Sequence, residues 1–169
     1  MRLAKCVENL DAVRRTLTEN GWQVEQTDPL RITVNAPEGV SGIALADRLR
    51  AQGVIAEYAD PEYLVLMVTP NNTPEDFARV IEALGVNTAP AAVREPLPVA
   101  IGEQSVSIRT ALFSPHETIP AAEALGRICG APTVSCPPAI PVVVSGERIG
   151  PEAIELFAHY GIETVDVLK

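Results

Sequence analysis

The sequence has few of the side chains that most often carry out chemistry. Lysine occurs only as Lys5 and Lys169, histidine only as His116 and His159, and aromatic residues make up 4% of the 169 residues. There is no glycine-rich phosphate loop, no Gly-x-Ser-x-Gly motif, and no cluster of histidine, cysteine and carboxylate residues at metal-ligand spacing. We therefore assign no catalytic, cofactor-binding or metal-binding residue from the sequence.

Cysteine is also scarce, and its pattern bears on the cellular setting. Cys6, Cys129 and Cys136 are odd in number and lack CxxC spacing, which argues against a disulfide framework and a zinc site. Reduced thiols favour the cytoplasm. No apolar run approaches the roughly 20 residues that span a bilayer, and Glu8 and Asp11 argue against a signal peptide. We expect a cytoplasmic protein with no membrane partner.

The composition favours a folded, acidic protein. Hydrophobic residues make up 47% of the chain, which predicts a packed core, and this core must be aliphatic because aromatic residues are few. The formal net charge is -9, from 22 acidic and 13 basic residues. Nucleic acid is not expected as a partner, because binding to phosphates requires a concentrated basic surface.

Three helices are predicted in the first 88 residues, over 2–20, 41–53 and 73–85. Ser41 and Thr73 are suited to cap the second and third helices, and Pro74 suits a first helical position. The first helix has one apolar stripe, formed by Leu3, Val7, Leu10, Val13 and Leu17. The apolar positions of the second helix are Ile43, Leu45, Ala46 and Leu49, and the buried face of the third is expected to be Phe77, Val80, Ile81 and Leu84.

Four strands are predicted between these helices, at Trp22–Gln26, Leu30–Ala36, Val54–Tyr58 and Tyr63–Val68. Polar residues alternate with Ile32 and Val34, as in a strand that is buried on one face. The unbroken apolar run at 63–68 predicts a central strand. The first unit, 1–88, is therefore predicted to be an α/β sandwich with helices packed on a small sheet.

The composition changes over residues 89–104, where prolines and alanines predict an extended linker. Residues 105–169 are predicted to form a second, α+β domain. Its expected elements are a strand-like or irregular segment Val106–Phe113, a helix from Thr118 to about Arg127, a rigid proline arm Cys136–Pro141, a strand Val142–Val144, a helix that begins at Pro151 and turns Ile154 and Phe157 inward, and a strand Ile162–Leu168.

Most single polar residues of this second domain have ordinary structural interpretations. His159 ends a predicted helix, where the dipole favours a positive charge. His116 is expected in a solvated loop, and Cys129 is expected to be a small core residue. Cys136 has no neighbouring cation in the sequence that would activate its thiol.

Several motifs in series resemble the C-terminal part of the ornithine/lysine/arginine decarboxylases. They are Glu117-Thr118-Ile119-Pro120, Glu123-Ala124-Leu125-Gly126-Arg127-Ile128, Cys136-Pro137-Pro138-Ala139-Ile140-Pro141 and Ser145-Gly146-Glu147-Arg148-Ile149. Segments 28–34 and 59–70 are similar to the small domain of the same family. The family has tyrosine and glycine where this chain has Cys136 and Ala139, so no role of that tyrosine is carried over.

The resemblance implies the small domain of a fold-type-I pyridoxal-phosphate enzyme followed by the family's C-terminal domain. In that family a preceding large domain holds the cofactor and supplies the Schiff-base lysine, so the resemblance implies neither cofactor nor independent catalysis in this chain. It also implies a large pyridoxal-phosphate domain or a full-length decarboxylase as a partner. The residues it implies for a channel wall or for docking are Glu117, Thr118, Glu123, Arg127, Cys136, Pro137, Pro138 and Glu147.

Three functions follow as alternatives. The chain is a non-catalytic part of a decarboxylase, or a stand-alone relative that regulates or binds a partner, or a sensor of basic amino acids or polyamines. A homo-oligomer is also expected, with the apolar stripe of the first helix as a candidate dimer seam.

Overall fold

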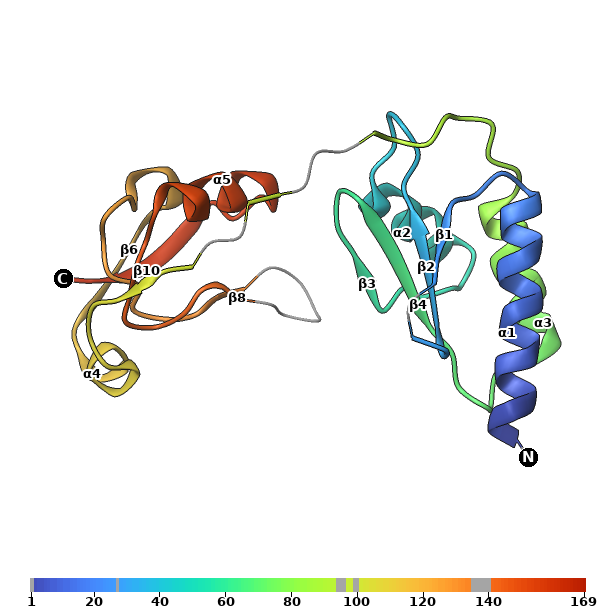
Figure 1. The fold of residues 1–169 in the computed structure, drawn as a ribbon, viewed down its shortest axis with the longest axis horizontal. Helices are drawn as coiled ribbons and strands as arrows, with labels where there is room; N and C mark the ends of the chain where they lie inside the picture. The colour runs from blue at the N-terminus through green and yellow to red at the C-terminus, as the bar shows by residue number, and fades with distance from the viewer. Residues whose placement is uncertain (1, 27, 94–96, 99–100, 135–140) are drawn as a thin grey trace. The chain divides into compact units, whose positions relative to one another are not determined.

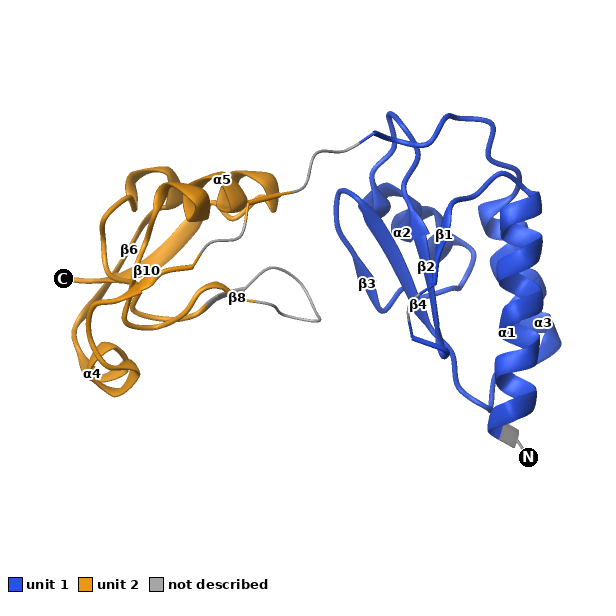
Figure 2. Cartoon of the chain, viewed as in Figure 1, with its two compact units in different colours: residues 1–94 blue, residues 95–169 orange. Residues whose placement is uncertain are grey.

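The computed structural model describes residues 2–26, 28–93, 97–98, 101–134 and 141–169 (Figure 1). The chain divides into two compact units, residues 1–94 and 95–169 (Figure 2). Each unit has its own buried hydrophobic core. Among the described residues, no helix combines the length and the apolar character that crossing a membrane requires.

Unit 1 is built on a four-stranded antiparallel sheet with the strand order β1-β2-β4-β3. Its strands are β1 (Val24–Glu25), β2 (Arg31–Asn35), β3 (Tyr58–Ala59) and β4 (Tyr63–Met67). The central pair, β2 and β4, places Ile32 opposite Leu66 and Val34 opposite Leu64. The prediction of a central strand at 63–68 is therefore confirmed. The edge strands are shorter than predicted, and β3 begins only at Tyr58.

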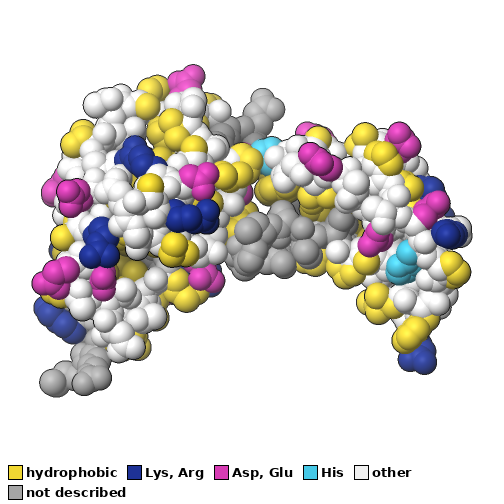
Figure 3. Space-filling model, turned by 180° about the vertical axis from the view of Figure 1, so that it is seen from behind, with side chains coloured by type: hydrophobic (Ala, Val, Ile, Leu, Met, Phe, Trp, Pro, Cys, Tyr) yellow, Lys and Arg dark blue, Asp and Glu magenta, His cyan; other side chains and the backbone are white. Residues whose placement is uncertain are grey.

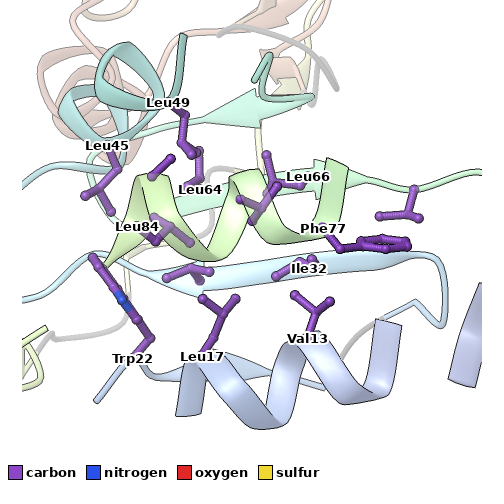
Figure 4. Packing of buried hydrophobic residues seen from close by; sticks show 14 of the residues in the cluster. Val13, Leu17, Trp22, Ile32, Leu45, Leu49, Leu64, Leu66, Phe77 and Leu84 are labelled. Carbon is purple, nitrogen blue, oxygen red and sulfur yellow. The ribbon is translucent and has the colours of Figure 1, made fainter. Parts of the chain in front are cut away.

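Three helices cover one face of this sheet: α1 (Arg2–Glu19), α2 (Gly42–Ala51) and α3 (Pro74–Leu84). Their buried residues meet Ile32, Leu64 and Leu66 in one core, as Figure 4 shows. α1 and α3 lie side by side (Figure 1). The predicted arrangement of helices on a small sheet is confirmed.

The predicted helix caps are also present. The Ala44 amide donates to Ser41 Oγ at 3.1 Å, at the start of α2. At the start of α3, the Thr73 amide donates to Asp76 Oδ2 at 2.8 Å and the Asp76 amide donates to Thr73 Oγ1 at 3.4 Å, which forms a reciprocal capping box. These bonds satisfy amide groups that a helix leaves unpaired in its first turn.

The end of α3 is held by two side chains from distant parts of unit 1. Trp22 Nε1 donates to the carbonyl oxygen of Gly85 at 2.9 Å. Arg48 Nε, on α2, donates to the carbonyl oxygen of Ala83 at 2.9 Å, and its Nη2 donates to that of Leu84. The last carbonyls of α3 therefore have partners that fix its position relative to α2 and to the segment after α1.

The prediction that the apolar stripe of α1 forms a dimer interface is wrong. Leu10, Val13 and Leu17 are buried against the sheet and α3, so they are not available to a second copy. Cys6 continues this buried row, whereas Leu3 is 54% exposed. The stripe expected from the sequence covers the protein's own core.

Two residues of unit 1 differ in burial from the pattern of their element. Ile43 is exposed on α2, because the buried face of that helix begins at Leu45. Thr33 is only 8% exposed, although the alternation along β2 predicted that it faces solvent. Its neighbours in the sheet, Glu25 on β1 and Val65 on β4, cover it from both sides.

In its described residues, unit 2 consists of short antiparallel strand pairs, two α-helices and a 3₁₀ turn. Its elements are β5 (Glu103–Gln104), α4 (Ile108–Phe113), β6 (His116–Pro120), the 3₁₀ turn η1 (Ala121–Glu123), β7 (Thr133–Val134), β8 (Pro141–Val143), β9 (Glu147–Arg148), α5 (Pro151–His159) and β10 (Thr164–Leu168). The pairs are β6 with β10, β5 with β9, and β7 with β8. The predicted α+β class is confirmed.

The segment 128–130 links two of these pairs. Ile128 forms an antiparallel bridge with Arg148 on β9, and Cys129 forms one with Val167 on β10. Backbone pairing therefore runs from β9 through this segment to β10 and on to β6. Cys129 lies in the core with Phe157 and Val167, as predicted for Cys129 and Phe157, whereas Ile154 is only partly buried.

Two elements of unit 2 differ from their predictions. Residues 108–113 form a helix rather than a strand or an irregular segment, because Ser107 caps it with a 3.0 Å bond from the Thr110 amide. Residues 116–120 form a strand rather than a capped helix that begins at Thr118. The β-branched side chains of Thr118 and Ile119 suit pairing with β10.

Candidate functional site

The candidate residues that the resemblance supplies all belong to unit 2, and five of the eight are described. Cys136, Pro137 and Pro138 lie outside the described residues. The others are carried by different elements: Glu117 and Thr118 by β6, Glu123 by η1, Arg127 by the turn that follows, and Glu147 by β9.

Glu117 and Arg127 are brought together. Arg127 Nη2 donates to Glu117 Oε1 at 2.5 Å and to the carbonyl oxygen of Leu168 at 2.7 Å. The two side chains are 41% and 36% exposed, so water screens part of their attraction. Arg127 therefore bonds to a backbone carbonyl of β10 as well as to a carboxylate of β6.

Thr118 points to the other face of the β6–β10 pair. Successive residues of a strand alternate between faces, so Glu117 and Thr118 diverge. Thr118 lies opposite Asp166, and its Oγ1 donates to Asp166 Oδ1 at 2.6 Å. Thr118 and Glu117 therefore do not line one surface of the strand pair.

The Glu147 side chain bonds to the backbone of its own turn. Its Oε2 accepts a hydrogen bond from the Val144 amide at 3.0 Å, which closes the turn between β8 and β9. The side chain also lies against Gly102, where an added Cβ would come within 2.8 Å of Glu147 Cβ. Glu123, in contrast, is exposed at the end of η1.

The described candidate residues therefore form one ion pair, one hydrogen-bonded pair and two separate carboxylates, not a convergent catalytic group. Within the described part of the chain, no group of three or more His, Cys, Asp or Glu residues could hold a metal ion. Figure 3 shows acidic and basic side chains interspersed with hydrophobic ones over the visible face of both units.

The lysines do not fit a Schiff-base role. The Lys5 side chain on α1 is 70% exposed and pairs with Glu8 at 3.3 Å, and Lys169 is exposed. A lysine that forms an imine is usually desolvated or placed beside another cation, which lowers its proton affinity. Neither residue has such surroundings, so neither lysine is placed to form an imine with pyridoxal phosphate.

His116 is placed differently from its prediction. It lies in β6, not in a solvated loop, and its Nε2 is 2.8 Å from the carbonyl oxygen of Ala111 at the end of α4. The ring packs against Gly130, where an added Cβ would lie 2.9 Å from His116 Cδ2. This contact makes Gly130 a requirement of the packing, which the local sequence did not reveal.

Comparison with known proteins gives one relative in sequence and a clear likeness in structure. No family model matches the chain. The uncharacterized protein YaaO of Bacillus subtilis (strain 168) is 27% identical over 135 residues, which cover 76% of this chain and 28% of YaaO.

The likeness in structure is to lysine decarboxylases. The constitutive lysine decarboxylase of E. coli and the lysine decarboxylase LdcF of Francisella novicida each give a TM-score of 0.74, at 12% and 14% identity. The match covers 99% of this chain and 40% of each enzyme. The chain has the fold of part of a lysine decarboxylase. Lysine decarboxylase A of Pseudomonas aeruginosa shares this decarboxylase fold, with a TM-score of 0.69 and 13% identity.

The resemblance predicted from the sequence motifs is thereby confirmed at the level of the fold. The chain spans about 40% of the solved enzymes' length, which is consistent with a C-terminal portion, and its sequence match covers 28% of YaaO.

Proposed function

We propose that this chain is the C-terminal, non-cofactor-binding part of an ornithine/lysine/arginine-type decarboxylase, and that it is not catalytic by itself. Its role is to dock beside a domain that carries pyridoxal phosphate and to form part of the wall of the substrate channel. We also propose that it acts in the cytoplasm and within an oligomer.

The observation that carries this proposal is the fold likeness, which covers 99% of the chain but only 40% of the E. coli enzyme. The motifs from Glu117 to Ile149 support it, because they occur in the family's order. The surroundings of the two lysines support the lack of independent catalysis, since neither is placed to form an imine.

The exposed candidate residues are the ones proposed to meet the partner. Thr118 and Glu123 are exposed, although Thr118 also donates to Asp166, whereas Glu117, Arg127 and Glu147 have partners within unit 2 and are only partly exposed. α4 adds an apolar contact surface. On this six-residue helix Ile108, Leu112 and Phe113 are 53%, 50% and 79% exposed. A cluster of large exposed apolar side chains on one short element is typical of a surface that another domain covers.

The first experiment tests the chain by itself. Pyridoxal phosphate is added to the purified chain, the imine absorbance band is sought, and carbon dioxide release is measured from ornithine, lysine and arginine. We expect neither a band nor turnover. Decarboxylation by the purified chain alone would overturn the proposal.

The second experiment tests docking. The transcript that encodes the chain is sequenced upstream of the Met1 codon, and any domain found there with a candidate Schiff-base lysine is co-expressed with the chain. We expect co-purification and restored decarboxylation, both lost in the variant Leu112→Ser/Phe113→Ser and retained in the matched control Val86→Ser/Val93→Ser, whose side chains are exposed in unit 1. A chain that binds a full-length decarboxylase without restoring activity would instead support the regulatory alternative.

A further inference from the structure

Unit 1 contains a pocket that the proposed function does not use. It has a volume of about 170 Å³ and is lined by residues of β2, β4, α3 and the loop after α2. An apolar cavity of about 150 Å³ is large enough to take up benzene. The pocket therefore suits a group of about six carbon atoms and is smaller than the roughly 300–1,000 Å³ typical of sites for drug-sized ligands.

The inner part of the pocket is apolar and fixed. Ile32, Leu66, Val68, Phe77 and Val80 line it, and each is at most 8% exposed. Figure 4 shows Ile32, Leu66 and Phe77 in the packed layer between α3 and the strands. Since these side chains also belong to the core of unit 1, the shape of the pocket does not depend on a ligand.

The outer part of the pocket is partly apolar. Ile55 is 68% exposed and Met67 is 48% exposed, and both line the pocket. A ligand seated between them would remove apolar surface from water, which favours binding.

Two opposite charges lie at the same pocket, one turn apart on α3. Asp76 and Arg79 are three residues apart, so they share a face of the helix. They do not form an ion pair with each other, and Arg79 has no hydrogen bond or ion pair among the described residues. Its Nη1 would lie 3.9 Å from a Cβ added at Gly53, on the loop across the pocket.

Asp76 uses only one of its two carboxylate oxygens in hydrogen bonds to the described residues. Oδ2 accepts from the Thr73 amide at 2.8 Å and from Asn72 Nδ2 at 3.5 Å. Within the described chain, Oδ1 takes part in no hydrogen bond. The hydrogen bond from the Thr73 backbone holds the pKa of Asp76 below its ordinary value, with a smaller contribution from the Arg79 guanidinium, so the carboxylate is charged at neutral pH.

We propose that this pocket binds a free α-amino acid with an aliphatic side chain of about the size of leucine. The α-carboxylate pairs with Arg79, the ammonium group pairs with Asp76 Oδ1, and the side chain enters the apolar pocket. An α-amino acid carries both charges on one carbon, so it can meet two charges that lie on one helix face. A polyamine does not fit, because Arg79 repels it and the apolar floor cannot solvate its amines.

The test is an NMR titration of the chain with L-leucine and three relatives. 3-Methylbutan-1-amine lacks the carboxylate, 4-methylpentanoate lacks the ammonium group, and L-lysine carries a charge at the end of its side chain. We expect saturable shifts of the Gly53, Val54 and Val80 amides with L-leucine at millimolar concentration. Each of the other three should bind about three- to tenfold more weakly or not at all.

Variants separate charge recognition from simple burial. Arg79→Gln and Asp76→Asn should each weaken L-leucine binding about three- to tenfold, and the asparagine keeps an acceptor for the Thr73 amide. Arg50→Gln is the matched control, because Arg50 is exposed, pairs with Asp47 at 3.3 Å and does not line the pocket.

Equal affinity of L-leucine and 3-methylbutan-1-amine would overturn the proposal, because it would show an apolar site without carboxylate recognition. Unchanged binding by Arg79→Gln, or the absence of saturable shifts in the pocket, would do the same. These outcomes do not depend on the proposed function, because that proposal concerns docking and restored decarboxylation.

Discussion

Arg127 links Glu117 to the backbone of the last strand. Its Nη2 donates to Glu117 Oε1 at 2.5 Å and to the Leu168 carbonyl oxygen at 2.7 Å, so one guanidinium joins β6, the turn after η1 and β10. This arrangement gives the Gly-Arg motif a structural role in unit 2, whatever its part in a channel wall.

Replacement of Arg127 should therefore destabilise unit 2. We expect Arg127→Gln to lower its free energy of unfolding by about 1–2 kcal/mol, since it removes two hydrogen bonds from a partly exposed site. Amide hydrogen exchange of β10 is the measurement. Arg109→Gln is the control, because Arg109 lies over the exposed ring of Phe113 and makes no such link. Equal effects of the two substitutions would contradict this role.

Trp22 should be a main determinant of the stability of unit 1. Trp22→Phe keeps an aromatic ring in the core but leaves the Gly85 carbonyl without its indole donor. We expect a loss of about 2–3 kcal/mol, from the missing hydrogen bond and the volume removed. Because Trp22 is the only tryptophan, unfolding must be followed by far-UV circular dichroism. A loss below about 0.5 kcal/mol would place the variant among ordinary surface substitutions and contradict the prediction.

Two glycines form a matched pair for testing close backbone contact. Gly126 and Gly146 both have positive φ, at +77° and +90°. A Cβ at Gly126 has nothing within 4 Å, whereas one at Gly146 would lie 2.3 Å from the Val106 carbonyl oxygen. We expect Gly126→Ala to cost about 1 kcal/mol from the left-handed backbone alone, and Gly146→Ala to cost clearly more. The melting temperatures of the two variants are compared by thermal unfolding. Equal melting temperatures would contradict the prediction that Gly146→Ala costs more.

The capping box at the start of α3 should make unit 1 less stable in acid. The folded state holds the pKa of Asp76 below its ordinary value of 3.8, chiefly through the Thr73 backbone amide. This contribution to stability is fully present above pH 3.8 and is lost as the pH falls through the lower, folded-state pKa. Asp76→Asn should therefore be less stable than the wild type at pH 7, and the difference should shrink below pH 3.8. A difference that stays constant from neutral to acidic pH would contradict this origin.

The helices of unit 1 could be predicted because their signals are local. Ser41, Thr73 and Pro74 mark the helix starts through the hydrogen bonds of the first turn, and the apolar spacing marks the buried faces. The buried face of α1 includes Cys6 and not Leu3, which differs from the predicted stripe. The helix pattern alone does not define which of these two residues is buried, because that depends on where the sheet and α3 lie.

Unit 2 was harder to predict because its strands are short and pair with distant residues. Threonine is a common residue at the start of a helix, so Thr118 was a reasonable helix cap. In the structure it instead donates to Asp166 on β10, almost fifty residues later in the chain. The motifs indicated the family fold without indicating this pairing. The pocket beside Asp76 and Arg79 was missed for the same reason, since its lining comes from four separate parts of unit 1.

The central place of β10 has a consequence for biosynthesis. This strand pairs with β6 on one edge and with the segment around Cys129 on the other. The described helices and strands of unit 1 lie within residues 2–84, so this unit can fold while translation continues. Unit 2 cannot close until residues 164–168 have left the ribosomal exit tunnel, and a nascent chain that stalls before them would present β6 with an open edge to chaperones and proteases.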